Sequence, residues 1–179
     1  MAIEEHIPLV EDILREWKNA IGEDYPGYRN HVYRMINFSL SFGDFNDEDR
    51  EKIFIAGCFH DLGIWSDNTF DYLPPSIARA REYLIKNGLD SWVPEIELMI
   101  GEHHKLRKYS DAGHPAIEAF RKGDLVDFSL GLVKCGLPSD YVRSVKAQFP
   151  NEGFHKGLVK TAGKWICRHP LNPVPVLKW

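Results

Sequence analysis

The sequence has few cysteines and none in a metal-binding or disulfide pattern. Its 179 residues contain three, Cys58, Cys135 and Cys167, which are widely separated and odd in number. The absence of a CxxC pair excludes a zinc ribbon, and isolated thiols do not build a disulfide framework. Such thiols in apolar surroundings are typical of a protein kept reduced in a cytosol. We therefore expect a cytoplasmic protein.

The sequence also lacks an excess of positive charge and a long apolar run. Its formal net charge is −4 and its isoelectric point is about 6.1, so no general basic field attracts a nucleic acid polymer. No apolar run reaches the roughly 18 residues that cross a bilayer. The first five residues include Glu4 and Glu5 rather than the basic start of a signal peptide. We expect neither a nucleic acid polymer nor a membrane as a partner.

Strand-like alternation, internal repeats and long linkers are absent too. Apolar residues instead recur at helical spacing, as in Val10, Ile13, Leu14 and Trp17. With 44% hydrophobic residues the chain can bury one core. We expect one all-α domain over residues 1–179, a bundle of about seven to eight helices. The expected helices cover residues 6–21, 24–42, 47–62, 74–87, 91–104, 116–134, 141–149 and 158–166, and the tail over residues 170–179 is expected to be an extended strap.

One expected helix has an unusual end. Residues 53–65 read IFIAGCFHDLGIW, so an apolar run closes on an adjacent imidazole and carboxylate, His60 and Asp61. Asn46 and the acids after it form a good helix start, and we expect Gly63 to end the helix. Such a helix should lie in the core, where a carboxylate needs a cation, a donor cluster or a metal beside it. Taken alone, however, a His-Asp pair at a helix end more often faces solvent.

Two further polar residues stand where apolar residues are expected. His31 lies on the apolar stripe of the second expected helix, and Asp124 lies on the same stripe as Phe128, four residues before it. A single inward histidine is usually a satisfied core residue. Together with His60 and Asp61, these residues provide two imidazoles and two carboxylates in an all-helical core. That set suits a borderline divalent metal, because a cation makes two neighbouring buried acids tolerable.

The order of these residues resembles the HD-domain metal-dependent phosphohydrolase superfamily. The match comprises YRNHVYR at residues 28–34, AGCFHDLG at 56–63, the His103-His104 pair and GDLVD at 123–127. It covers roughly residues 24–135, and the last helices and the Pro-rich tail, residues 136–179, lie beyond it. The resemblance implies that one divalent transition metal ion, Mn, Ni, Co, Fe or Zn, is bound by His31, His60, Asp61 and Asp124. It also implies that His103 and His104 line the substrate site.

The sequence departs from two branches of this superfamily. Nucleotidase-like and alarmone-hydrolase-like branches carry an acid three residues after the HD aspartate, and Ile64 stands there. Their general base therefore does not transfer to this chain. Dinuclear branches carry a further histidine near the position of Pro75 and Ser76. We therefore expect one metal ion, although His103 and His104, with His114, leave a second site open.

The resemblance implies hydrolysis of a small anionic phosphorylated metabolite or nucleotide by a metal-activated water. Asp61 is expected to orient the water, and His103 or His104 to protonate the leaving oxygen. The expected phosphate-binding residues are Arg34, Lys105 and Arg107, with Lys108 as a further candidate.

Two other functions remain open. One is a dinuclear iron oxygenase or lyase on the same scaffold, and the other is a non-catalytic helical module stabilised by its metal. The tail carries Val174, Val176, Leu177 and Trp179. Because these residues are too apolar for a free terminus, the tail is expected to pack on the body or on a second copy in a homo-oligomer.

Overall fold

A computed structural model describes residues 1–110 and 113–176, and within these ranges every regular element is helical. The all-α prediction is therefore confirmed. The described ranges contain nine α-helices, of which α4 is a single turn, so the other eight agree with the seven to eight expected. None of these helices is long and apolar enough to span a membrane. The helices are α1 (Pro8–Ile21), α2 (Tyr25–Leu40), α3 (Asp47–Phe59), α4 (Gly63–Ser66), α5 (Leu73–Lys86), α6 (Val93–Glu102), α7 (Pro115–Phe128), α8 (Ser139–Gln148) and α9 (Phe154–Arg168), with short 3₁₀ turns at Gly22–Asp24 and Asp90–Trp92.

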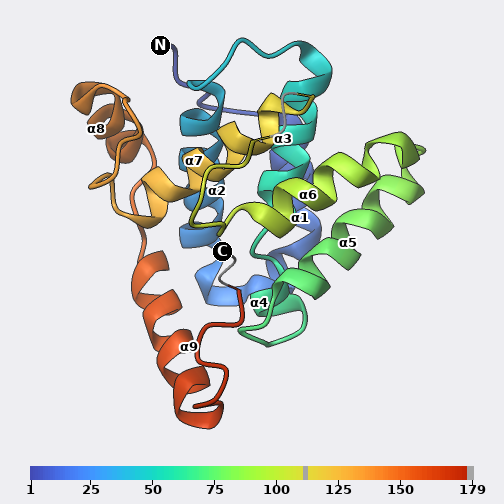
Figure 1. Cartoon of the computed structure of the whole chain (residues 1–179), viewed down its shortest axis with the longest axis vertical. Helices are drawn as coiled ribbons and strands as arrows, with labels where there is room; N and C mark the ends of the chain where they lie inside the picture. The colour runs from blue at the N-terminus through green and yellow to red at the C-terminus, as the bar shows by residue number, and fades with distance from the viewer. Residues whose placement is uncertain (111–112, 177–179) are drawn as a thin grey trace.

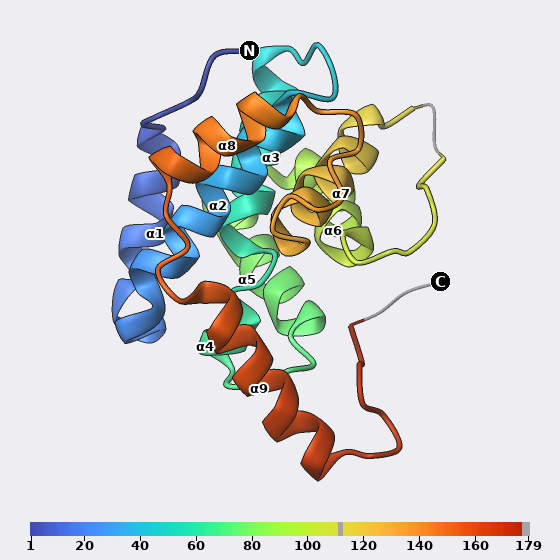
Figure 2. The ribbon, with the colours of Figure 1, turned by 90° about the vertical axis from the view of Figure 1, so that its left-hand side faces the viewer.

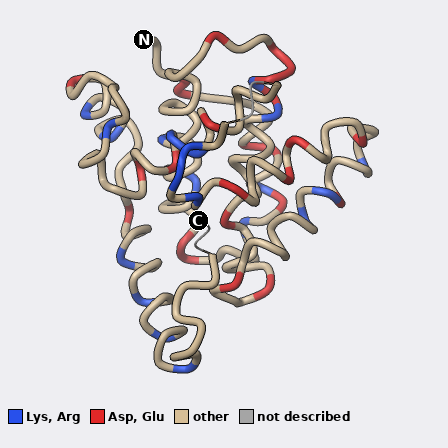
Figure 3. The backbone as a smooth tube through the Cα atoms, in the orientation of Figure 1, with Lys and Arg blue, Asp and Glu red and all other residues tan. Residues whose placement is uncertain are grey.

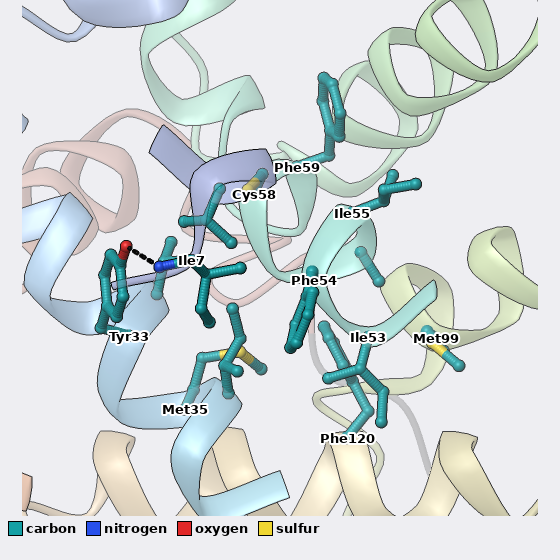
Figure 4. Close-up of a cluster of buried hydrophobic side chains, with 14 of the residues drawn as sticks. Ile7, Tyr33, Met35, Ile53, Phe54, Ile55, Cys58, Phe59, Met99 and Phe120 are labelled. Atoms are coloured by element: carbon teal, nitrogen blue, oxygen red, sulfur yellow. Dashed lines mark hydrogen bonds between the residues drawn. The ribbon is translucent and has the colours of Figure 1, made fainter. Parts of the chain in front are cut away.

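The helices pack around α3, which contacts α1, α2, α5, α6 and α7. In Figure 1, α5 and α6 form a pair on one side of the bundle and α8 lies on the other. The apolar run of α3 is buried almost all round, as its sequence predicts. Figure 4 shows Ile53, Phe54 and Phe59 among the core side chains. Burying each such side chain stabilises the fold by about 1.5–3 kcal/mol, which holds the end of α3 deep in the protein.

The largest helix–helix interface joins α2 and α7, and Gly123 makes it possible. A Cβ atom on Gly123 would lie 2.6 Å from the carbonyl oxygen of Met35 and would also clash with Ser39 Oγ. The two backbones are therefore closer than any other residue would allow. Because Asp124 is the next residue, this approach brings its carboxylate against the inward face of α2.

The end of α3 differs from the expectation. The helix ends at Phe59 rather than at residue 62, and Gly63 begins α4 instead of ending α3. Gly63 is needed for a close approach, because a Cβ atom there would lie 2.5 Å from the carbonyl oxygen of Tyr72. Its N–H donates to Ser76 Oγ over 2.9 Å. His60 and Asp61 thus lie in a tight turn between two helices.

The end of α7 differs as well. The helix stops at Phe128, not at residue 134, because Leu130 and Gly131 take positive φ angles of 56° and 80°. The chain turns away there towards α8. Phe128 was expected in the core, but its side chain is 55% exposed. The apolar period of α7 therefore continues one turn beyond its buried part.

The last helix leaves the bundle, and the segment after it turns back towards α7 (Figure 2). Residues 170–176 form turns rather than the extended strap expected. Val176 is buried in a small cluster with Phe70 and Tyr72, against which Trp165 of α9 packs. Packing of the tail on the body is thus confirmed for Val176. Leu177 and Trp179 lie outside the described residues.

Candidate metal centre

Four buried side chains meet where α2, the turn after α3 and α7 converge. His31 belongs to α2, His60 and Asp61 to the turn, and Asp124 to α7. The Nε2 atoms of His31 and His60 are 2.9 Å apart. Asp61 Oδ2 lies 3.6 Å and 3.4 Å from them, and Asp124 Oδ1 lies 3.7 Å and 3.8 Å from them. The structure therefore brings together all four residues that the sequence pattern selects.

The outer ring nitrogen of each histidine faces an acceptor. His31 Nδ1 lies 2.7 Å from Asp127 Oδ2. His60 Nδ1 and His103 Nδ1 lie 2.8 Å and 2.7 Å from the carbonyl oxygens of the residues three before them, Gly57 and Ile100. Because carboxylate and carbonyl oxygens only accept, each Nδ1 donates its proton outward. In the neutral imidazole this leaves the Nε2 lone pair directed at the centre.

This arrangement of donors and charges fits a cation. Two Nε2 lone pairs at 2.9 Å repel each other unless a proton or a metal lies between them. Burial lowers the pKa of His60 to about 3, although Asp61 acts in the opposite direction. Burial raises the pKa of Asp124, and the charges of Asp61 and Asp127 raise it further against the effect of nearby histidines. A cation at the centre would let both acids ionise.

Two buried atoms beside this group have no hydrogen-bond partner among the described residues, Asp61 Oδ1 and His103 Nε2. They lie 3.5 Å apart. An unsatisfied buried polar atom costs about 1–3 kcal/mol, so both have reason to bind a ligand. Ligand atoms of Asp61, His103 and His104 all lie within 4.8 Å of one another, as do those of His31, His60 and Asp61. The residues present fit a metal centre, and Asp61 belongs to two potential ligand groups.

Arg34 does not reach this centre as a phosphate-binding residue. Its guanidinium is buried and forms a two-pronged ion pair with Asp127, with Nε 2.5 Å from Oδ1 and Nη2 2.8 Å from Oδ2. Nη1 donates to the carbonyl oxygen of Phe149 over 3.0 Å. Burial alone would raise the pKa of Asp127, but hydrogen bonds from His31 and Arg34 lower it. Arg34 therefore fixes Asp127, and Asp127 orients the imidazole of His31.

A cavity of about 320 Å³ opens beside the centre. The loop after α4 contributes Phe70 and Tyr72 to the wall of this cavity. Loops next to a site commonly form its walls, and this loop closely follows the turn that holds His60 and Asp61. His31, Asp61, Asp124 and both neighbouring histidines lie at one end. His103 is buried, whereas His104 is partly exposed and its Nε2 lies 2.6 Å from the hydroxyl of Tyr72. A ligand in the cavity can thus contact the candidate metal residues and His104 together.

The basic residues after the histidine pair differ in whether they border the cavity. Lys105 lines the cavity, with Nζ 2.8 Å from Glu102 Oε2. Arg107 is exposed and lies outside the cavity wall, as does Lys108. Arg121, which the sequence pattern did not single out, lines the cavity, but its guanidinium is held by Glu118. Of the expected phosphate-binding residues, only Lys105 borders the cavity.

Sequence reasoning missed two contributors to the site, Tyr72 and His155. His155 Nε2 lies 3.0 Å from the carbonyl oxygen of Asp127 and so supports that residue from α9. No spacing in the sequence links either residue to the motif residues. Asp127, the last residue of the GDLVD segment, is buried behind His31. His114, just before α7, belongs to neither candidate ligand group.

Comparison of this chain with protein-family models, with curated proteins and with solved structures found no match.

Proposed function

We propose that this protein is a metal-dependent phosphohydrolase of the HD-domain type that acts on a small phosphate ester. The observation that supports this best is the convergence of Nε2 atoms and carboxylate oxygens in a buried centre that opens into a cavity bordered by Lys105. Neutral imidazoles with outward Nδ1 protons are suited to metal binding. A lysine beside such a centre is suited to a dianionic phosphate.

In this proposal His31, His60, Asp61 and Asp124 hold one divalent transition metal ion. Such an ion polarises a phosphoryl oxygen and lowers the pKa of a coordinated water. Asp127 and the carbonyl oxygen of Gly57 keep the two imidazoles in the binding orientation. The assignment uses ligands from three parts of the chain, so it depends on the complete fold rather than on one helix.

The remaining steps use side chains that border the cavity. In the hydrolysis, water attacks phosphorus, the ester P–O bond breaks, and the leaving oxygen takes a proton. Asp61 Oδ1, without a partner among the described residues, is placed to accept a hydrogen bond from the water. Lys105 offsets the negative charge on the phosphoryl oxygens. His103, whose Nε2 also has no partner among the described residues, is the residue we assign to the leaving oxygen, because Asp61 and Asp124 raise the pKa of its imidazole against the effect of burial.

A second candidate function is favoured by the group formed by Asp61, His103 and His104. If this group holds a second ion, Asp61 would belong to both ligand groups, and His103 and His104 would be ligands, so that neither would be free to act as a proton donor. A dinuclear iron oxygenase or lyase would then be the better assignment. A non-catalytic module that keeps one ion for stability would bind metal without turnover.

Elemental analysis of the purified protein, combined with a phosphatase substrate screen, tests these assignments. About one equivalent of metal with turnover supports the phosphohydrolase. About two equivalents of iron without phosphatase activity supports the dinuclear alternative, and one equivalent without any turnover supports the module. The matched variants are His60→Ala, which should lose the metal, and His6→Ala, an exposed histidine outside the centre, which should keep it. Full metal occupancy in His60→Ala would contradict the assignment of His31, His60, Asp61 and Asp124 as the ligands of one ion.

A further inference from the structure

The cavity continues from the metal centre into an apolar chamber. Twelve of its twenty lining residues are apolar, so most of its wall offers no hydrogen bond. The far wall comes from α9 and the segment after it, through residues such as Leu158, Ile166 and Val174. Phe128, exposed at the end of α7, closes one side. The last apolar residue of α7, Phe128, thus lines the cavity and does not pack in the core.

Apart from the candidate metal residues and His103, the polar side chains of the wall already have hydrogen-bond partners. The hydroxyl of Tyr72 is bonded to His104. Arg121 is held by Glu118 and by the carbonyl oxygen of Lys105. Lys105 pairs with Glu102 at the end next to the metal centre. The described wall therefore provides charge for a phosphate at one end, but no free polar group that would recognise a sugar or a nucleobase at the other.

The basic residues of α9 lie outside the chamber wall. Lys156, Lys160, Lys164 and Arg168 follow one another at four-residue spacing, and α9 contains no acid. In Figure 3, basic residues recur along the helix that projects from the bundle. The helix therefore presents apolar side chains to the chamber and positive charge at its surface.

We propose that the ligand of this site is a phosphate monoester whose organic part is apolar, an alkyl, prenyl or aryl group, rather than a nucleoside or sugar phosphate. This proposal rests on the proposed function for the position of the phosphate. The volume of about 320 Å³ corresponds to roughly ten water-sized groups at ~30 Å³ each. Because the phosphate head takes up part of this volume at the metal centre, the chamber accepts a chain of fewer than about ten carbon atoms.

The test measures binding of methyl-, butyl-, octyl- and dodecylphosphonic acid to the metal-loaded full chain by calorimetry, below their micelle concentrations. Phosphonates keep the anionic head and are not hydrolysed, so the readout does not depend on turnover. Affinity should rise by up to about fourfold per methylene and stop rising once the chamber is full. Equal affinity for methyl- and octylphosphonic acid would overturn the proposal, as would no binding of any member.

Matched variants separate the chamber from general hydrophobic attraction. Ile166→Asn places a polar group on the chamber wall, whereas Ile85→Asn makes the same change on α5 outside it; the two isoleucines are 43% and 55% exposed. Ile166→Asn should lower the affinity for octylphosphonic acid at least tenfold, whereas Ile85→Asn should leave that affinity unchanged. Ala162→Phe should make the gain stop at a shorter chain while methylphosphonic acid binds as before. Identical chain-length profiles in all variants would contradict the chamber assignment.

The outcomes also separate this proposal from the proposed function. If affinity depends on chain length but no phosphate ester is hydrolysed, the ligand class stands and the phosphohydrolase assignment fails. If nucleotides and short phosphate esters are hydrolysed well and affinity is independent of chain length, the phosphohydrolase assignment stands and the apolar ligand fails.

Discussion

Replacing Gly123 by alanine tests whether the contact between α2 and α7 positions the metal centre. The new Cβ atom would lie 2.6 Å from the carbonyl oxygen of Met35, whereas ordinary contacts begin near 3.4 Å. The helices must therefore separate locally by about 0.8 Å to restore ordinary contact, the difference between these distances. The obstacle is main-chain, so no side-chain rotation relieves it.

The separation should affect both stability and metal binding. Overpacking of this kind costs about 1–3 kcal/mol, against which the better helix propensity of alanine returns about 1 kcal/mol. A shift of 0.8 Å would also lengthen the 2.7 Å contact between His31 and Asp127, to at most about 3.5 Å, and so weaken this hydrogen bond. We therefore expect a net loss of up to about 2 kcal/mol and reduced metal occupancy.

Gly163→Ala in α9 is the matched control. A Cβ atom on Gly163 meets nothing within 4 Å, so this change should stabilise α9 slightly or have no effect. The assays are urea unfolding at a fixed metal concentration and elemental analysis of the purified variants. If Gly123→Ala unfolds at the same urea concentration as the parent and holds the same amount of metal, the close approach of α2 and α7 does not position the centre.

Three further predictions follow from the site and the tail. Asp124→Ala should lose most of the bound metal, whereas Asp127→Ala should keep more, at a cost of about tenfold in affinity or activity; equal metal content by elemental analysis would contradict this order. Lys105→Glu should raise KM for a phosphorylated substrate and weaken its salt dependence, while Arg107→Glu, outside the cavity wall, should change KM little; similar steady-state kinetics in the two would remove Lys105 from the site. Truncation after Arg168 removes the buried Val176 and should lower the melting temperature or dissociate an oligomer; an unchanged melting temperature and solution mass would show that the tail does not stabilise the protein.

Arg34 shows where sequence reasoning about charge was insufficient. An arginine one turn after a candidate ligand histidine is as well suited to a phosphate as to a buried carboxylate. The choice depends on Asp127, which lies 93 residues away in the sequence and is brought close only by the packing of α7 on α2. The same packing places Asp127 against His31. Arg34 therefore holds the carboxylate that orients the His31 imidazole, and it does not bind a phosphate.

Phe128 shows the limit of helical periodicity. The pattern of α7 continues past its buried part, and periodicity alone does not tell a core contact from the wall of a cavity. The difference is decided by α9, which carries its own apolar face and leaves a chamber between itself and α7. Gly63 is similar, because its role follows from the backbone of Tyr72 rather than from its position near a helix end.

The sequence by itself determined the all-α fold, the buried character of α3 and the four residues that meet at the centre. These features depend on the spacing of apolar side chains along each helix and on polar residues that interrupt that spacing, and both are local properties of the chain. Only the tertiary structure decided which histidine nitrogens face inward, that Arg34 is committed to Asp127, and that an apolar chamber adjoins the centre. Those features depend on distances between helices far apart in the sequence, such as the 96 residues between His31 and Asp127, and local spacing carries no information about them.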